Sequence, residues 1–343
     1  MKLGKVSDSI LKRSVLKYCK LKEEYFHEHR NSKRENGTGV GEDCAVFSWD
    51  SQAKVMIGNA SGSFKAPHQM KYAFMRAANT IYAQGGYPES ATLHIMMPYK
   101  LREAKLKIMM QEAHDTARDL GIEIAAGHTE TTMAVNYPCV SVSMLGSTKL
   151  EFPNKVEVGD DIVMTKWAGL LGTVELTERY EEMLSHRFSK SFLEQAKRLS
   201  EGLSVEKEAE IGMQCQVSAM HDIAEGGVFG ALWELAERSE VGLDVDIKKI
   251  PLKQETVEIC NHLDLNPYEL LGSGSLLLTS KDGYHLMEAL EQQGIHAKVI
   301  GKITDSNARM IYNEEESRFL EPSRNEELYR MDAKECEKLQ EES

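Results

Sequence analysis

Hydrophobic positions change their period along the first half of the chain and predict alternating strands and helices. Short apolar runs predict strands at 54–58, 91–97, 122–126 and 140–145. Apolar residues at helical spacing predict helices over 67–83 and 100–120, the second of them closed by Gly121. The alternation ends near residue 150, which predicts one α+β domain over residues 1–152.

The second half repeats this alternation and predicts another α+β domain over residues 153–322. Apolar runs predict its strands at 162–165, 217–220, 241–247, 270–278 and, last, 297–300. Two charged stretches fall outside the pattern. Residues 30–36 are expected to form an exposed loop, and the tail 323–343 a loosely packed helix or a disordered end. Large apolar side chains are rare in the tail, which carries Leu328, Tyr329, Met331 and Leu339.

Composition narrows the classes of function. The 343 residues carry a net charge of −13, so the chain lacks the basic excess of a nucleic-acid binder or of a protein that binds anionic membranes. Its six cysteines are scattered and form no Cys-x-x-Cys pair, which argues against a zinc cluster and a disulfide framework. The first residues resemble no signal peptide, and no apolar run approaches membrane-spanning length. We therefore expect a cytoplasmic protein.

The stretch 218–237 has the pattern of a strand, a turn and a helix. His221 and Asp222 lie at the end of the predicted strand, and Gly226 and Gly227 begin the helix. The first turn of a helix has unpaired backbone N–H groups, and glycines let an anion approach them closely. A phosphate group would fit there. The alternative is an ordinary connection between a strand and a helix.

A second glycine-rich stretch, residues 37–46, runs into a predicted strand. It combines Gly39 and Gly41 with the carboxylates of Glu42 and Asp43. Glycines beside carboxylates suit a place where the backbone approaches phosphates while an oxygen ligand holds Mg²⁺. Glycine and acidic residues are also common in plain turns. This stretch alone does not separate the two interpretations.

Seven short motifs follow one another along residues 1–310: Gly39-Val-Gly-Glu-Asp-Cys-Ala-Val46, Ala126-Gly-His-Thr-Glu130, Gly159-Asp160, Gly169-Leu-Leu-Gly-Thr173, His221-Asp-Ile-Ala-Glu-Gly-Gly227, Val241-Gly-Leu-Asp-Val245 and Ser273-Gly-Ser275. In this order they resemble the aminoimidazole ribonucleotide synthetase (PurM-like) superfamily. The opening Leu3-Gly-Lys-Val6 and the segment 125–130 are most similar to its HypE-like branch, the hydrogenase-maturation proteins. They favour that branch over thiamine-monophosphate kinase and selenophosphate synthetase.

The resemblance implies a two-domain α+β architecture and an ATP-binding function. The N-terminal domains of two copies would form a barrel-like sheet in a homodimer, and the C-terminal domain would close a cleft that holds ATP and Mg²⁺. By position, Asp43 and Asp222 would bind the metal, and Asp43, His128 and Glu130 would be the catalytic residues. The nucleotide-binding residues would be Gly39, Gly41, Asn79, Gly127, Thr129, Asp222, Gly226 and Gly227.

The chain departs from the family pattern at three places. Where these families usually carry Thr-Asp and Asn-Asp, this sequence has Asn59-Ala60 and Asn79-Thr80. Without two carboxylates, a Mg²⁺ site would be weakened, because Mg²⁺ is held through oxygen ligands such as carboxylates. HypE-type proteins also end in a cysteine that receives a carbamoyl group. Here Cys336 precedes the end and is flanked by glutamates, which disfavour its thiolate, so we do not expect that reaction.

Three functions remain open from the sequence. The first is ATP-dependent activation of a small amide, carboxylate or phosphate substrate, which is not identified. The second is a non-catalytic dimer with a weakened Mg-ATP site that acts as a scaffold or sensor; Ala60 and Thr80 motivate it. The third is a kinase that phosphorylates a small phosphate-bearing molecule.

Overall fold

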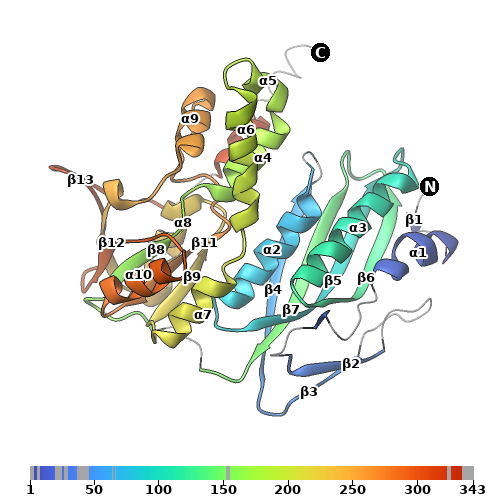
Figure 1. Cartoon of the computed structure of the whole chain (residues 1–343), viewed down its shortest axis with the longest axis horizontal. Helices are drawn as coiled ribbons and strands as arrows, with labels where there is room; N and C mark the ends of the chain where they lie inside the picture. Colours follow the sequence, from blue (N-terminus) through green and yellow to red (C-terminus); the bar gives the residue numbers. More distant parts are fainter. Residues whose placement is uncertain are drawn as a thin grey trace. The chain divides into compact units, whose positions relative to one another are not determined.

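The chain forms two compact units, Met1–Glu151 and Phe152–Ser343, in a computed structural model (Figure 1). The structure describes residues 4–5, 8–19, 25–26, 30–36, 46–63, 65, 67–151, 155–322 and 326–333. Each unit is an α+β arrangement around one mixed sheet. The α+β organisation expected from the alternating pattern is therefore confirmed.

Unit 1 is built on a five-stranded sheet. Its strands lie in the order β1 (Gly4–Lys5), β6 (Glu123–Thr132), β5 (Tyr87–Pro98), β7 (Cys139–Thr148) and β4 (Lys54–Ser63). Only the β5–β6 pair is parallel among the paired strands of this sheet. Helices α2 (Gln69–Tyr82) and α3 (Glu103–Asp119) cover one face (Figure 1). Strand β4 lies at one edge of the sheet.

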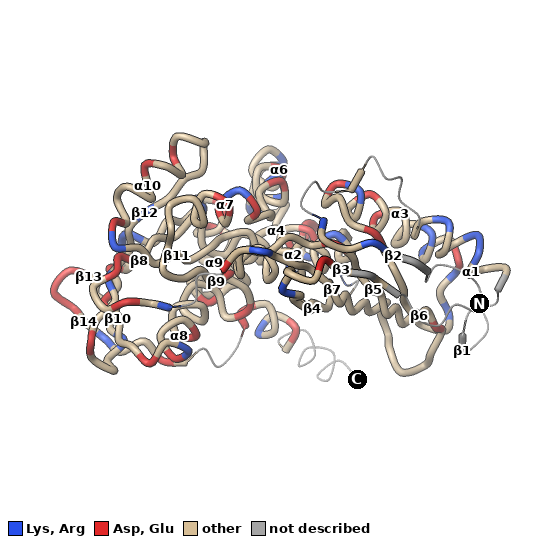
Figure 2. Tube along the Cα trace, turned by 90° about the horizontal axis from the view of Figure 1, so that it is seen from below, with Lys and Arg blue, Asp and Glu red and all other residues tan. Residues whose placement is uncertain are grey.

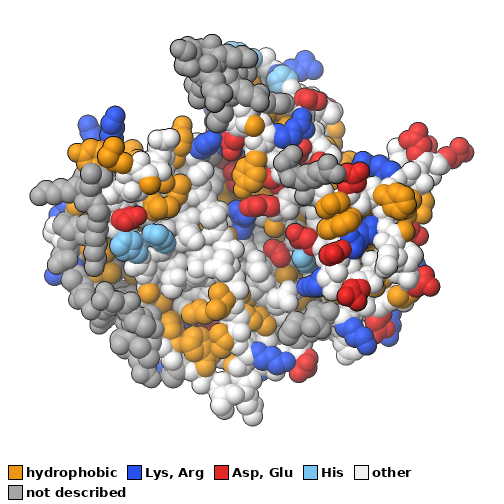
Figure 3. All heavy atoms as spheres, turned by 180° about the vertical axis from the view of Figure 1, so that it is seen from behind, with side chains coloured by type: hydrophobic (Ala, Val, Ile, Leu, Met, Phe, Trp, Pro, Cys, Tyr) orange, Lys and Arg blue, Asp and Glu red, His pale blue; other side chains and the backbone are white. Residues whose placement is uncertain are grey.

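Alternation along the strands explains why only one face is covered. In β5, Leu93, Ile95 and Met97 are buried, whereas the intervening His94 is exposed. Val140, Val142 and Met144 continue the buried side in β7. Since successive side chains in a strand point to opposite faces, the intervening residues form a second face that no helix of the described residues covers, called the uncovered face below; Figure 3 shows the molecule from behind.

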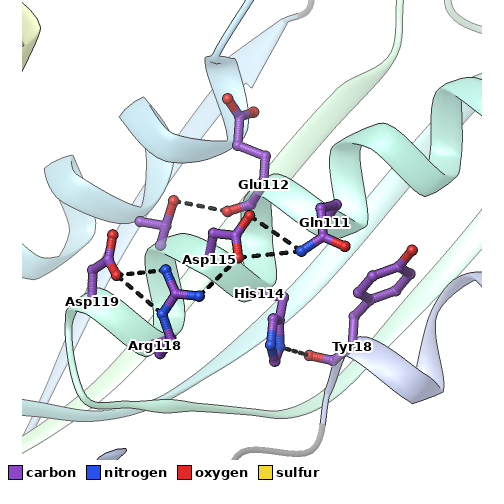
Figure 4. A network of polar contacts seen from close by, with 8 residues as sticks. Tyr18, Gln111, Glu112, His114, Asp115, Arg118 and Asp119 are labelled. Atoms are coloured by element: carbon purple, nitrogen blue, oxygen red, sulfur yellow. Dashed lines mark hydrogen bonds and ion pairs between the residues drawn. The ribbon is translucent and has the colours of Figure 1, made fainter.

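Two N-terminal segments pack onto this framework. Helix α1 (Asp8–Ser14) leads into the short turn η1 (Leu16–Tyr18), where the Tyr18 carbonyl is 2.9 Å from Nδ1 of His114 on α3. Figure 4 shows this contact beside an acidic and basic network on α3, in which Arg118 binds Asp115 at 3.2 Å and Asp119 at 3.0 Å. The contact between Tyr18 and His114 ties η1 to α3, whereas the Arg118 ion pairs lie within α3 itself.

The expected exposed loop at 30–36 is largely a strand. Residues Ser32–Asn36 form β2, which pairs with β3 (Val46–Trp49). Just before it, Arg30 forms an ion pair with Glu123 of β6, whose side chain is only 3% exposed. The backbone N–H of Asn31 donates to Oε1 of the buried Glu89 at 2.9 Å. The charged residues of this segment therefore include one, Arg30, that forms a tertiary contact.

Unit 2 contains a seven-stranded sheet. Its order is β14 (Glu316–Phe319), β13 (Arg309–Asn313), β10 (Gly242–Asp246), β12 (Ala297–Thr304), β8 (Asp161–Thr165), β11 (Ser275–Ser280) and β9 (Ala219–Ile223). Strand β12 was expected to be the last in the chain, yet β13 and β14 follow it and extend the sheet beyond β10. Figure 2 shows acidic residues along this added hairpin. Its four-residue strand β14 is exposed throughout and lacks the apolar alternation that would have revealed it.

Helices cover both faces of the unit 2 sheet at its centre. Helix α8 (Gly227–Ser239) packs its buried side chains into one core with residues of β8, β9, β10 and β11. Helices α7 (Glu206–Gln214) and α10 (Gly283–Gln292) pack against β11 as well. Every residue of β11 is consequently buried. Because both faces of β11 are covered, buried and exposed residues do not alternate along this strand.

The remaining helices pack on one another. They are α4 (Leu170–Arg179), α5 (Glu181–Ser185), α6 (Lys190–Arg198) and α9 (Gln254–Leu263). Residues 327–333, within the tail expected to be loose, are helical, and Leu328 and Met331 are buried. Across the described part of the chain, no helix combines the length and the apolar character needed to span a bilayer.

Candidate functional site

Strand β6 carries four of the predicted site residues. Gly127, His128, Thr129 and Glu130 were expected in a loop after a strand, but all four lie within β6. Their pairing with β5 extends the strand, since His94 lies opposite His128 and continuous register runs to Thr132. Gly127 and Glu130 are residue types that are depleted in strands, and pairing with β5 overrides that weak local preference.

The alternation of β6 separates these residues. Thr129 is 5% exposed, on the side covered by helices, whereas His128 and Glu130 lie on the uncovered face. Nε2 of His128 is 3.6 Å from Oε2 of Glu130. The ring of His94 lies 5.5 Å from that of His128, centroid to centroid. Two imidazoles and a carboxylate therefore form a partly exposed cluster that can exchange protons with a ligand or with solvent.

Gly127 has a packing reason to be glycine. A Cβ atom there would lie 2.3 Å from the backbone oxygen of Leu93 in the neighbouring strand. That distance is far shorter than a normal contact, so a larger residue would push β5 and β6 apart. The close strand approach alone accounts for this glycine.

The positions that lack the family's aspartates lie on β4 and α2. Asn59 is exposed on the uncovered face, whereas Ala60 is 9% exposed and faces the helices. Asn79 is buried in α2, and the Thr80 hydroxyl donates to the Arg76 carbonyl at 3.2 Å. An Nη1 atom of Arg76 in turn donates to the Ser61 carbonyl at 3.0 Å and links the helix to the strand. This part of unit 1 thus has a cationic side chain close to the position of a missing carboxylate.

In unit 2, His221 and Asp222 lie within the edge strand β9. Their partners in β11 are Leu277 and Leu276. Nε2 of His221 is 2.9 Å from Oε2 of Glu234 on α8, so this imidazole bridges the strand and the helix. Asp222 is partly exposed one residue before the strand ends.

Gly226 and Gly227 begin helix α8 as predicted, and both have left-handed backbone conformations, with φ of 77° and 61°. A Cβ atom on Gly227 would lie 2.4 Å from the Tyr268 carbonyl oxygen and 2.8 Å from that of Leu270. Both the conformation and the crowding require glycine there. The N–H donors of this turn were expected to be free, but that of Gly226 already donates a hydrogen bond within the chain.

A residue that the sequence did not point to fills this turn. Oε2 of Glu326 accepts a 2.7 Å hydrogen bond from the N–H of Gly226, and its Oε1 accepts one of 2.8 Å from Leu271. The Leu328 N–H also reaches Oε1, at 3.3 Å. Burial, together with the nearby Glu225, raises the pKa of the Glu326 carboxyl to about 7 against the effect of these bonds. The only sequence signal was Leu328 and Met331 at helical spacing in a charged tail.

Of the two predicted metal ligands, Asp222 lies in the described part of the chain. Gly39, Gly41 and Asp43, as well as Cys336, lie outside the described residues. Among the residues that are described, no group of three His, Cys, Asp or Glu side chains is arranged to hold a metal ion. Asp222 therefore has no described cluster of protein ligands around it.

Comparison with known families decides what the chain is related to. Residues 41–148 match the N-terminal domain of the family described as AIR synthase related protein, and residues 157–313 match its C-terminal domain. The chain belongs to the AIR synthase related proteins. The resemblance seen in the seven motifs is thereby confirmed, and the two matched regions lie in the two units.

Two curated relatives match most of the length of this AIR synthase related protein. A hydrogenase expression/formation protein of Methanocaldococcus jannaschii is 24% identical over 327 residues, covering 90% of each chain. A selenide, water dikinase of Carboxydothermus hydrogenoformans is also 24% identical, covering 80% of this chain and 87% of its own. The expected similarity to HypE-like proteins is confirmed, but identity does not separate that branch from the dikinases.

Solved structures share the fold. The crystal structure of E. coli HypE superposes with a TM-score of 0.68 at 18% identity, covering 79% of this chain and 87% of that one. A HypE structure in complex with ATP gives 0.67 at 14% identity, covering 91% and 93%. At these identities the likeness shows the two-domain PurM-like fold.

Proposed function

We propose that this AIR synthase related protein binds ATP and uses it to activate a small amide, carboxylate or phosphate substrate. The observation that carries the proposal is the match to both family domains in order, with Gly41 and Asp43 inside the first matched range and Asp222, Gly226 and Gly227 inside the second. Structures that share the fold include HypE in complex with ATP and a ThiL protein complexed with AMPPCP and TMP. Asp43, Gly39 and Gly41 in unit 1, and Asp222, Gly226 and Gly227 in unit 2, would contact the nucleotide.

Within this proposal, His128 and Glu130 supply proton-transfer groups. Both are partly exposed, and their side chains are 3.6 Å apart. A neutral imidazole beside a carboxylate can accept a proton and be stabilised as the imidazolium. His94 lies beside them and would tune the same pair electrostatically.

Magnesium would have Asp43 and Asp222 as its protein ligands. Alanine at position 60 and threonine at position 80 leave this site with fewer carboxylates than the family pattern, and a magnesium ion would depend more on phosphate oxygens and water. Titration of the protein with Mg²⁺ alone and with ATP would measure this dependence.

A homodimer formed through unit 1 accompanies the proposal. Strand β4 is an edge strand, and it exposes Val55 by 50% and Ile57 by 66%. An edge strand has unpaired backbone groups, and exposed apolar side chains beside it favour pairing with another strand. We expect Ile57→Lys to lower the dimer fraction in light scattering after gel filtration. Exposed Ile108 on α3, changed to Lys, is the matched control.

A non-catalytic scaffold or sensor is the second candidate, and Ala60 and Thr80 favour it because they remove two carboxylates from the family pattern. The small-molecule kinase is a third, supported by the ThiL likeness of fold. Steady release of ADP, measured with and without candidate phosphate-bearing substrates, separates the three. Turnover that Asp43→Asn and Glu130→Gln abolish supports an enzyme, whereas the exposed Glu315→Gln should not change it. Nucleotide binding without any turnover would instead support the scaffold.

A further inference from the structure

The turn that begins α8 is occupied by an acidic side chain from residues 326–333, called the terminal segment below. Oε2 of Glu326 accepts a 2.7 Å hydrogen bond from the N–H of Gly226, and Oε1 accepts bonds from Leu271 at 2.8 Å and Leu328 at 3.3 Å. Two of these donors lie 100 and 55 residues away in the sequence. Since Glu326 is only 5% exposed, its carboxyl group joins two distant turns in the interior of unit 2.

The hydrogen bonds of Glu326 favour its ionised form. All three donors are backbone N–H groups, and both oxygens act as acceptors. Such bonds are stronger to a charged carboxylate than to a neutral acid. Glu225, on the turn before α8, repels the docked carboxylate and would repel an incoming anion as well, so its charge favours neither. Docked Glu326 is thus an anion at the start of a helix, where the helix dipole stabilises negative charge.

Two further N–H groups of this turn are bound by residues outside the terminal segment. The N–H of Gly227 donates to the Ala224 carbonyl and that of Phe229 to the Tyr268 carbonyl, both at 3.2 Å. The two bonds from the turns to Glu326 differ, because their acceptor is a side chain at the beginning of the terminal segment. An external anion gains these two donors when that side chain leaves them.

The terminal segment has other contacts that do not involve the start of α8. Asp332 forms an ion pair with Arg179 of α4. Glu327 accepts a 3.0 Å bond from the backbone N–H of Asn266. The ion pairs of the segment do not include Glu326. The Glu326 contacts can therefore break while the outer part of the segment stays bound to unit 2.

We propose that Glu326 is an internal competitor for the phosphate-binding turn, so that a phosphate group binds at the start of α8 by displacing its carboxylate. The inference rests on the proposed function, which has Gly226 and Gly227 contact the nucleotide. A carboxylate and a phosphate cannot accept from the same buried N–H groups of Gly226 and Leu271 at once, so docking of Glu326 and binding of phosphate exclude each other. The apparent affinity for phosphate is lowered in proportion to the fraction of molecules whose turn is free.

Hydrogen exchange of the full chain at about pH 8 tests the displacement. Burial raises the pKa of Glu326 to about 7, so at this pH the group is ionised whether or not it is docked. MgATP and inorganic phosphate are added in separate samples. We expect exchange in peptides that contain the Leu328 amide to rise at least about threefold with one of them, because that amide loses its acceptor. Release by inorganic phosphate but not by MgATP would assign the turn to a phosphate-bearing substrate.

Unchanged exchange of the Leu328 amide with both compounds, in a sample whose calorimetry shows bound ATP, would overturn the internal competitor and leave ATP binding standing. The absence of binding of either compound would overturn both proposals. The two failures are therefore distinguishable in the same sample.

The affinities of variants give a second test by titration calorimetry. Glu326→Gln should bind the displacing compound at least about tenfold more tightly than the unmodified chain, because the charge-assisted bonds that hold Glu326 are lost. Glu315→Gln, exposed on the β13–β14 turn, should leave the affinity unchanged. If Glu326→Gln does not fold, Met331→Ala loosens the segment without altering the turn and should also tighten binding. Equal affinities of the folded variant and the unmodified chain would overturn the internal competitor.

Discussion

The Nζ atom of Lys166 lies 2.6 Å from Oε1 of Glu208, in the interior of unit 2, where the two side chains are 15% and 3% exposed. Lys166 follows β8 with a positive φ of 52°. Its ammonium also donates to the carbonyls of Gly202 and Ser204, at 2.8 and 2.5 Å. Burial lowers the pKa of Lys166, and Glu208 opposes that shift. The pair therefore ties β8 to η3 (Leu199–Gly202) and α7.

Removing one partner of this buried pair should be costly. We expect Lys166→Met to lower the free energy of unfolding by about 3–5 kcal/mol, because Glu208 is left buried without its counter-charge. Urea unfolding monitored by circular dichroism measures the change. The surface pair Lys281–Glu157, at 2.9 Å with exposures of 75% and 44%, offers the control. Lys281→Met should cost less than about 1 kcal/mol. Equal costs for the two variants would contradict the structural role of Lys166.

Gly227 should tolerate substitution less well than another glycine with similar backbone angles. Alanine at position 227 would meet two carbonyl oxygens within 2.8 Å in addition to its φ of 61°. We expect a loss of at least about 3 kcal/mol. Gly294 has a φ of 76° with open space around it, so Gly294→Ala should cost only about 1 kcal/mol. Similar melting temperatures of the two variants would show that crowding at position 227 is absent.

Cysteine reactivity gives an independent check of packing in unit 2. Burial, and to a lesser extent Glu327, raises the pKa of the Cys260 thiol to about 12. At pH 8 only about one molecule in ten thousand then carries the reactive thiolate. Iodoacetamide should modify the half-buried Cys139 and Cys215 before Cys260, which should react only after unfolding. Mass spectrometry of timed digests gives the order, and early alkylation of Cys260 would contradict the burial of α9.

Much of the architecture could be predicted from the periodicity of apolar residues and from glycines that mark the ends of helices and strands. The start of α8 at Gly226–Gly227 is an example, because helical spacing and a turn signal coincide there. Strand β6 was predicted too short, since Gly127 and Glu130 have weak strand propensity and pairing with β5 extends the strand through them. Strand β14 could not be predicted because its residues are all exposed.

The contacts that could not be predicted from the sequence are made by charged residues whose partners lie far away in the chain. Arg30 looked like part of a solvated charge run but pairs with the buried Glu123. Glu326 looked like one of many tail glutamates but accepts N–H bonds at the predicted phosphate site. Charged side chains usually lie in solvent. A charged residue that is instead paired with a group distant in the chain has no local sequence pattern that distinguishes it.

Equilibrium binding of ATP in the presence of Mg²⁺ tests the central claim most directly. Titration calorimetry of the full chain should show saturable binding below millimolar nucleotide. Asp43→Asn should weaken that binding at least tenfold, whereas Glu315→Gln, on an exposed turn of unit 2, should leave it unchanged. The absence of binding to the unmodified chain at millimolar ATP would contradict the account.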